Sequence, residues 1–259
     1  MKKFALALLG VFTLLVFTLL YAEQNPVPPA HDPAPVPPAQ SDVRPQPEPP
    51  APPQPPEPLA WLVGVEDRHP YNQELQHYLP EQCRTRDHTL YLTAEQTEDG
   101  YISGKAESEF AFRYGEFSFR IRTMRGAGLF PALWMLPAHG SAYPEVDLYE
   151  LIGSRPHEIF GVLHYQEGGR HYFRHKFPQS SGPDAIVLDF SWTPDKLVWT
   201  VDGQEFYSVD KDVPREPMYF IANLAVGGSW PGAPDRSTPF PATFAVDVLK
   251  FEPIETFTR

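Results

Sequence analysis

Residues 196–209 read Lys-Leu-Val-Trp-Thr-Val-Asp-Gly-Gln-Glu-Phe-Tyr-Ser-Val, the clearest local indication of β-structure in the chain. Asp202-Gly203 separates two strand-like runs. An Asp-Gly pair between two such runs is the strongest short signal for a β-hairpin, because both central residues of a type I′ turn need positive φ. The stretch therefore predicts two antiparallel strands joined by a tight turn.

The same period of two recurs over the rest of residues 59–259. Residues 90–94 and 117–122 alternate between apolar and polar side chains, and in 244–249 the residues Phe244, Val246 and Val248 share one face. No window from residue 59 onward carries a capped apolar stripe with helical spacing. Many short strands with turn residues between them predict an all-β antiparallel sandwich.

Proline divides the chain into parts. The protein has 259 residues and 32 prolines, of which 16 fall within residues 26–58. A segment that is half proline cannot pack a core, so we expect a disordered spacer at 26–58 ahead of a globular domain at 59–259. In polyproline II conformation the spacer would reach about 100 Å. A semi-rigid stalk is the simpler interpretation, and a ligand for a proline-binding partner is the alternative.

The first 25 residues have the pattern of an export signal. Lys2 and Lys3 precede an apolar run from Phe4 to Ala22. The run is long for a signal peptide and close to the length that spans a bilayer, so residues 1–25 are interpreted as either a cleaved signal peptide or a membrane anchor. Both alternatives place the domain outside the cytoplasm, in the cell envelope or periplasm if anchored, or secreted if cleaved.

Charge and cysteine content exclude several function classes. The net charge is −12, and residues 59–259 alone carry −10 (18 basic against 28 acidic residues). Such a domain repels polyanions, so nucleic acids and sulfated polymers are poor partners. The single cysteine, Cys83, excludes an intrachain disulfide framework and a cysteine-based zinc site, and we expect it on a strand.

One predicted strand carries three carboxylates. Residues 143–153 read Tyr-Pro-Glu-Val-Asp-Leu-Tyr-Glu-Leu-Ile-Gly. Glu145 and Asp147 share a face, and Val146 takes the opposite, core face. A regular strand would turn Glu150 away, whereas one bulge residue returns it to the acid face. Because the neighbours are apolar and aromatic, we interpret this as an inward-facing acid strand and not as a solvated acidic surface.

Two carboxylic acids on one face suit glycoside hydrolysis. Retaining enzymes use one carboxylate as nucleophile and a second carboxyl group, about 5–5.5 Å away, as acid and base. Asp147 between the two glutamates can share a proton with Glu145, and its charge helps to keep Glu150 protonated.

The acid strand and four further segments resemble segments of glycoside hydrolase family 16. They occur in the family's order along the chain, and the resemblance covers nearly all of residues 70–253. The Glu-Val-Asp-Leu-Tyr-Glu strand resembles the bulged active-site strand of that family. The further segments are residues 72–78 (Asn-Gln-Glu-Leu-Gln-His-Tyr), 114–137, 162–165 (Val-Leu-His-Tyr) and 223–232 (Asn-Leu-Ala-Val-Gly-Gly-Ser-Trp-Pro-Gly). The last is typical of laminarinase-like members. The resemblance implies a concanavalin A-like β-jelly-roll sandwich and retaining endo-hydrolysis of β-linked glucans or galactans.

By this resemblance Glu145 is the nucleophile, Glu150 the general acid/base and Asp147 the assisting carboxylate. Further positions are implied to lie at the sugar-binding cleft: Trp134, His164, Trp230, Asn72 and Asn223. The tryptophans could stack on sugar rings, and the asparagines offer a donor and an acceptor to hydroxyl groups. Trp230 lies among glycines and prolines, so we expect it to be exposed.

This sequence departs from the family pattern at the rim of the site. Tyr143 and Pro144 replace a tryptophan and a glycine, and Lys105 replaces an arginine that many members have. These changes leave the preferred linkage open. A structural calcium near Asp247 is possible by resemblance, but no cofactor is required.

Two histidines follow Gly168-Gly169 at a spacing that a metal pair on a helix would have. His171 and His175 are four residues apart, but basic neighbours favour a loop over a metal site.

We therefore expect a monomeric, exported endo-hydrolase of β-1,3- or mixed β-1,3/1,4-glucan. The alternatives are a galactanase or transglycosylase of the same fold, a non-catalytic glucan-binding protein, and an envelope protein whose function is the stalk itself. The presence of both glutamates argues against the last two.

Overall fold

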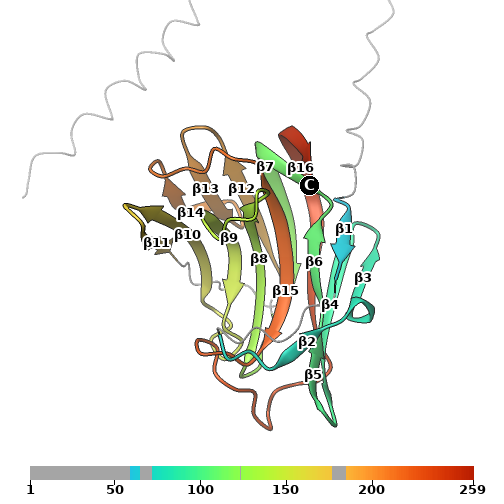
Figure 1. Cartoon of the computed structure of the whole chain (residues 1–259). Coiled ribbons are helices and arrows are strands. Elements are labelled where there is room, and N and C mark those ends of the chain that lie inside the picture. The colour runs from blue at the N-terminus through green and yellow to red at the C-terminus, as the bar shows by residue number, and fades with distance from the viewer. Residues whose placement is uncertain (1–58, 65–71, 123, 177–184) are drawn as a thin grey trace, which may run out of the picture. The chain divides into compact units, whose positions relative to one another are not determined.

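A computed structural model describes residues 59–64, 72–122, 124–176 and 185–259 of the chain, and β-strands dominate these residues (Figure 1). The expected export segment at 1–25 and the spacer at 26–58 lie outside the described residues. No helix among the described residues has the length and apolar character needed to cross a membrane. One short 3-10 helix, η1 (Pro80–Gln82), is the only helical element of the described part.

The described part of the domain contains sixteen strands. They are β1 (Trp61–Val63), β2 (Gln76–Tyr78), β3 (Cys83–Arg86), β4 (Thr89–Thr97), β5 (Gly100–Ser103), β6 (Lys105–Ser108), β7 (Phe110–Arg122), β8 (Leu129–Pro137), β9 (Glu145–Leu151), β10 (Ile159–Glu167), β11 (Arg170–Lys176), β12 (Ala185–Trp192), β13 (Leu197–Val201), β14 (Gln204–Val209), β15 (Met218–Val226) and β16 (Ala242–Thr258). Cys83 begins strand β3, as expected.

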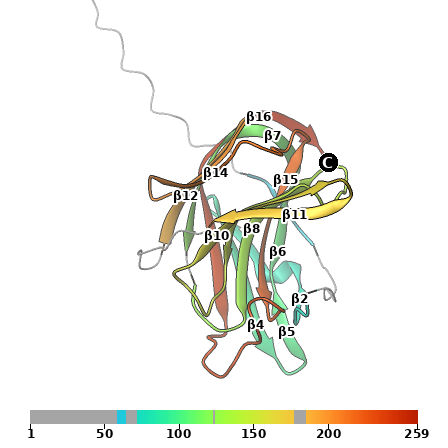
Figure 2. The ribbon, with the colours of Figure 1, turned by 90° about the vertical axis from the view of Figure 1, so that its left-hand side faces the viewer.

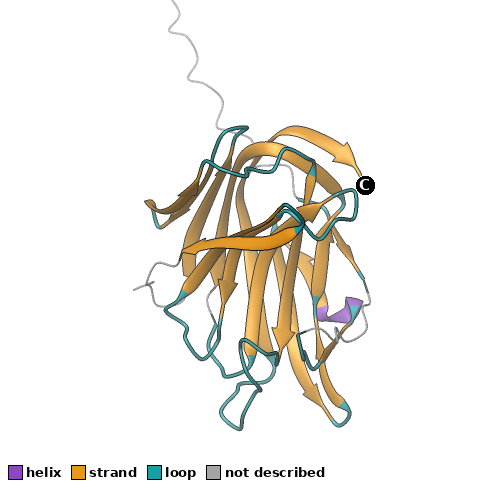
Figure 3. Ribbon diagram, turned by 60° about the vertical axis from the view of Figure 1, so that its left-hand side comes forward, coloured by secondary structure: helices purple, strands orange, loops and turns teal. Residues whose placement is uncertain are grey.

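Hydrogen bonds join the strands into two facing layers (Figures 2 and 3). One layer has the order β11-β10-β9-β8-β15-β6-β1, and the other runs from β14 through β13, β12, β7 and β16 to β4. The layers connect where Met218 of β15 pairs with Phe112 of β7. All strand pairs are antiparallel except β2 with β5. The expected antiparallel sandwich is therefore confirmed.

Aromatic rings fill the space between the layers. Tyr149 of β9 stacks on Phe244 of β16 with ring centroids 5.8 Å apart, and Phe119 of β7 lies 5.8 Å from Phe220 of β15. These four side chains are buried. Burial of such rings removes large apolar areas from water and dominates the energetics of a core. The alternation of apolar residues along the strands places these rings inside.

The hairpin predicted at residues 196–209 is confirmed. Asp202 and Gly203 both have positive φ, 50° and 79°, between β13 and β14. Trp199 of β13 is fully buried, and its indole N–H donates a hydrogen bond of 3.1 Å to the backbone carbonyl of Asp147. The hairpin thus supports the acid strand from the core side.

The prediction of a loop after Gly168-Gly169 is wrong, because this segment forms strand β11. Gly168 and Gly169 have φ of 57° and 77° and form the tight turn of a second hairpin, β10–β11. Strand β11 is the last strand of its layer. Basic side chains are common on such edge strands, where charge discourages pairing with another chain. The basic residues that suggested a loop are therefore compatible with an edge strand.

Candidate active site

The acid strand β9 lies between β8 and β10 and contains the expected bulge. Asp147 pairs with Val162 of β10 and Glu150 pairs with Phe160, so Leu148 and Tyr149 together oppose the single residue between those partners. The register against β8 also shifts there. Leu148 and Tyr149 are both buried in the core. The bulge thus returns Glu150 to the face that carries Asp147.

Cross-strand register extends this face over three strands. Glu145 pairs with His164 of β10, which in turn pairs with Phe173 of β11. The next row joins Asp147, Val162 and His175 in the same way. These rows border a cleft of about 430 Å³. Its lining residues are Glu150, Arg155, Phe160, Val162, His164, Phe173, His175 and Trp230.

His164 contacts two of the three acids. Its Nε2 lies 3.3 Å from Oδ2 of Asp147 and 3.6 Å from Oε1 of Glu145. Partial burial by itself lowers the pKa of His164, but the contacts with Asp147 and Glu145 outweigh burial, and the pKa is raised. His164 therefore favours the charged state beside the carboxylates.

Burial raises the pKa values of all three carboxyl groups, and repulsion from neighbouring carboxylates adds to the rise for Glu145 and Glu150. Loss of solvent and the charge of Asp147 raise the pKa of Glu145 to about 8, and the positive charge of His164 opposes this rise. The pKa of buried Asp147 is raised by loss of solvent and held back by His164. Loss of solvent and the charges of Asp147 and Glu145 raise the pKa of Glu150 well above its usual value.

The surroundings of the two glutamates therefore differ. His164 favours the ionised form of Glu145, whereas the named influences on Glu150 all favour its protonated form. Environments that separate two carboxyl groups in this way assign one as base or nucleophile and the other as acid.

The same cluster could hold a cation. Ligand atoms of Glu145, Asp147 and His164 lie within 4.8 Å of one another, the only such group of three or more His, Cys, Asp or Glu side chains within the described ranges. Asp247, near which the family resemblance allows a structural calcium, forms an ion pair of 3.1 Å with Arg120. The two histidines with the spacing of a metal pair have separate contacts: His171 bonds to His164, and His175 borders the cleft.

The aromatic and amide residues expected at the cleft divide into two groups. Trp230 is exposed, as expected, and its ring packs edge-on against Phe160 and Phe130 at the cleft. Asn72 is exposed near Trp230, since its carbonyl accepts a hydrogen bond from the backbone N–H of Ser229. Both residues are therefore accessible to a ligand.

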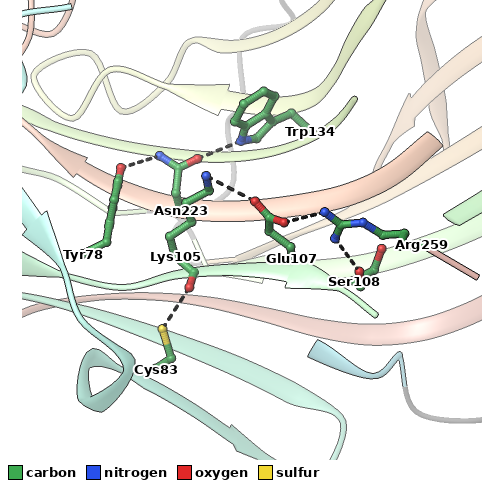
Figure 4. A network of polar contacts seen from close by, with 8 residues as sticks. All are labelled: Tyr78, Cys83, Lys105, Glu107, Ser108, Trp134, Asn223 and Arg259. Carbon is green, nitrogen blue, oxygen red and sulfur yellow. Dashed lines mark hydrogen bonds and ion pairs between the residues drawn. The ribbon is translucent and has the colours of Figure 1, made fainter. Parts of the chain in front are cut away.

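Trp134 and Asn223 bond to each other (Figure 4). The indole N–H of Trp134 donates to Oδ1 of Asn223 at 2.8 Å, and Nδ2 of Asn223 donates to the hydroxyl of Tyr78 at 3.0 Å. Asn223 is buried. Its amide orients Trp134, which pairs with Asp147 across β8 and β9. Lys105, where many family members have arginine, forms an ion pair of 3.3 Å with Glu107 in the same network.

Residues on β11 were missed by sequence reasoning. His171 Nε2 lies 2.9 Å from Nδ1 of His164, on the side of the ring away from the acids. The ring of Tyr143 stacks on His171 at 4.5 Å. Phe173 and His175 follow at intervals of two. The alternation of ring residues after a Gly-Gly pair was the available signal, since it indicates a hairpin strand with one aromatic face.

Comparison with known sequences assigns the family. The chain matches the family described as glycosyl hydrolases family 16 over residues 72–243. It is 30% identical over 220 residues to glucan endo-1,3-beta-glucosidase A1 of Niallia circulans, covering 69% of this chain and 32% of that protein. It is 29% identical to a beta-glucanase of Rhodothermus marinus, covering 69% and 74%. The match thus spans about a third of the first relative and three quarters of the second.

Solved structures agree with this assignment. The laminarinase from Rhodothermus marinus has a TM-score of 0.66 and 28% identity, with 77% of this chain and 92% of that chain covered. The endo-beta-1,3-glucanase from Pyrococcus furiosus has a TM-score of 0.64 and 30% identity, with 77% and 89% covered. With three carboxylates on one face of a bulged strand, an all-β sandwich and a family match over most of the domain, the chain belongs to glycosyl hydrolases family 16.

Proposed function

We propose that this domain is a retaining endo-β-glucanase that hydrolyses β-1,3-glucan or mixed β-1,3/1,4-glucan by double displacement. The observation that carries the proposal is the placement of Glu145, Asp147 and Glu150 on one face of β9, with Asp147 buried between the glutamates. The names of the relatives give the substrate class, because they are glucan endo-1,3-glucosidases, beta-glucanases and laminarinases.

In the proposed reaction Glu145 attacks the anomeric carbon as a carboxylate, while Glu150 gives its proton to the departing glycosidic oxygen. A covalent glycosyl-enzyme forms as the glycosidic bond breaks. Water then attacks the same carbon and releases Glu145, while Glu150 takes the proton from that water. The configuration of the sugar is retained because it is inverted twice.

Asp147 and His164 prepare the two glutamates for these roles. The charge of Asp147 raises the pKa of both glutamates, which helps Glu150 to keep the proton that it donates. His164 acts in the opposite direction on Glu145 and favours the ionised nucleophile. The reaction needs no cofactor.

Sugar release from a panel of polymers tests this function. The purified domain is incubated with laminarin, mixed-linkage β-glucan, agarose and carrageenan, and the products are sized, with Glu145→Ala as the inactive control. We expect oligosaccharides of several lengths from laminarin, with a weaker expectation for the mixed-linkage polymer. Oligosaccharides from agarose alone would show that the domain is a galactanase and not a glucanase. Products longer than the substrate would indicate transglycosylation.

We also propose that the domain acts outside the cytoplasm. The apolar run Phe4–Ala22 after two lysines and the proline-rich spacer support this location. The full chain is expected to fractionate with membranes, and proteolysis within 26–58 is expected to release an active, soluble domain. A mature protein beginning at Glu23 in the soluble fraction would show cleavage after Ala22 instead.

A further inference from the structure

Two large rings are exposed at the cleft, and the proposed reaction uses neither directly. Trp230 is 45% exposed and Phe173 of β11 is 58% exposed. A ring left in water forgoes the stabilisation that burial would give. Trp230 lies in a segment that the family resemblance already placed at the cleft. Phe173 has no such explanation, so its exposure beside Glu150 in the cleft indicates a binding position.

Register fixes where Phe173 lies relative to the acids. It pairs with His164, which pairs with Glu145, so the three residues form one row across β11, β10 and β9. Neighbouring strands are spaced by about 4.8 Å, which places Phe173 about 10 Å from the acid strand. A ligand that contacts both Glu145 and Phe173 must therefore extend beyond the sugar at the cleavage point.

The ring of Phe173 is surrounded by other rings. Its centroid lies 5.9 Å from that of His164, 6.4 Å from that of His171 and 5.5 Å from that of His175. His171 and His175 share the cleft side of β11 with Phe173, and His164 faces it from β10, so these rings restrict the orientations open to Phe173. A ring that is already held in place loses little conformational entropy when a ligand stacks on it.

The opposite face of β11 secures the strand. Arg174 forms an ion pair of 2.8 Å with Asp212, in the segment after β14, and its guanidinium lies 4.1 Å from the ring centroid of Tyr165. Tyr172 stacks on Tyr165 with centroids 5.7 Å apart. The two faces of β11 thus differ: Arg174 attaches the strand to the domain, Tyr172 packs on Tyr165 within the same hairpin, and Phe173 faces the cleft.

The composition of the cleft suits a sugar better than a purely apolar ligand. A pyranose has apolar C–H faces that stack on aromatic rings and hydroxyl groups that bond to polar side chains. Phe173 offers a stacking surface, while His175 and Arg155 offer polar groups in the same cleft. Apolar walls with a few polar groups are typical of small-molecule sites.

We propose that Phe173, with His175 beside it, forms a further sugar-binding position on the β11 side of the acids, where one ring of the glucan chain stacks. This inference rests on the proposed function. The position favours long chains, because only a chain that extends past the cleavage point toward β11 reaches Phe173. It thereby favours cleavage within a polymer over cleavage of short oligosaccharides.

Binding to a catalytically inactive protein tests the position. The full domain with Glu145→Gln is titrated with β-1,3-linked gluco-oligosaccharides of two and six sugars, alone and with Phe173→Ala added. We expect the affinity for the six-sugar chain to fall about tenfold, the effect of losing one aromatic stacking contact. The affinity for the disaccharide should change less than twofold, and Phe173→Trp should retain the affinity for the long chain.

Tyr172→Ala is the matched control, because Tyr172 is an exposed aromatic residue on the other face of the same strand. Equal losses for Tyr172→Ala and Phe173→Ala, an unchanged affinity for the six-sugar chain in Phe173→Ala, or no binding of either oligosaccharide would overturn the position. Wild-type hydrolysis is measured separately. If oligosaccharide binding depends on Phe173 but the wild type does not hydrolyse glucan, the proposed glucanase activity is refuted and the sugar-binding position at Phe173 is supported. If the wild type hydrolyses glucan but binding does not depend on Phe173, only the sugar-binding position is refuted.

Discussion

The hairpins β10–β11 and β13–β14 have the same kind of turn and different roles. Each turns through two residues with positive φ, Gly168-Gly169 in the first and Asp202-Gly203 in the second. The β13–β14 hairpin directs Trp199 into the core, where it is fully buried. The β10–β11 hairpin leaves Phe173 exposed at the cleft. Turn chemistry thus determines that a hairpin forms, and the placement of its aromatic residues determines what the hairpin does.

Both hairpins contact Asp147. Trp199 donates to the backbone carbonyl of Asp147 at 3.1 Å from the core side. His164 of β10 lies 3.3 Å from its carboxylate on the cleft side. One hairpin therefore fixes the backbone of the acid strand, and the other adjusts its charge. This division between stability and chemistry predicts different effects for substitutions in the two hairpins.

The largest effect is expected for Trp199→Ala. Loss of a fully buried indole and its hydrogen bond should lower the free energy of unfolding by about 3–5 kcal/mol, measured by urea denaturation. Phe173→Ala in the other hairpin should change it by no more than about 0.5 kcal/mol, because the ring is exposed. Similar losses for both variants would refute the division.

Glu145→Gln should stabilise the domain at alkaline pH. The folded state holds the pKa of Glu145 at about 8, above its usual 4.5. Between these pH values the folded state binds more protons than the unfolded state, so wild-type stability falls as pH rises. The variant has no such group and should be more stable at pH 8 by at most about 4 kcal/mol, which is a gain of several degrees in Tm.

Below pH 4 both states bind the proton, so thermal unfolding should show little difference between the wild type and Glu145→Gln. An equal gain in Tm at pH 4 and pH 8 would show that packing causes the effect and not titration. A gain that is absent at pH 4 and grows between about pH 4.5 and pH 8 would show that the cleft side of β9 is maintained at a cost in stability.

A smaller effect is expected for His171→Ala. His171 Nε2 can accept a hydrogen bond from Nδ1–H of charged His164, so its loss should lower the pKa of His164. His164 then carries less charge beside Glu145, and the pKa of Glu145 should rise. The acid limb of kcat/KM should move to higher pH by a fraction of a unit.

His171→Gln, which keeps an acceptor, should shift the acid limb less than His171→Ala does. Tyr172→Ala, one residue away on the opposite face of β11, should leave the limb in place. An acid limb that moves equally in all three variants, or moves to lower pH in His171→Ala, would contradict the positioning role of His171.

The sequence predicted the parts of the site that depend on local pattern. Alternation predicted the sandwich, and the spacing of Glu145, Asp147 and Glu150 required a bulge, which the structure contains. The glycines and prolines around Trp230 predicted its exposure. These features follow from backbone geometry over a few residues, which sequence pattern reports directly.

The sequence did not predict contacts that depend on neighbouring strands. The bond between Asn223 and Trp134 joins residues 89 positions apart, and it shows that Asn223 orients a ring. The stacking of Tyr143 on His171 and the register of Phe173 with Glu145 require the pairing of β11 with β10. The basic composition of residues 170–176 concealed that pairing, because edge strands and loops share such composition.

Azide rescue of two alanine variants tests whether Glu145 forms the covalent bond and Glu150 supplies the proton. Glu145→Ala should lower turnover by several orders of magnitude, since no glycosyl-enzyme can form. With an activated aryl β-glucoside, azide should then give a glycosyl azide of inverted configuration from Glu145→Ala and of retained configuration from Glu150→Ala. Hydrolysis by Glu145→Ala at the wild-type rate, or the two configurations exchanged between the variants, would contradict the account.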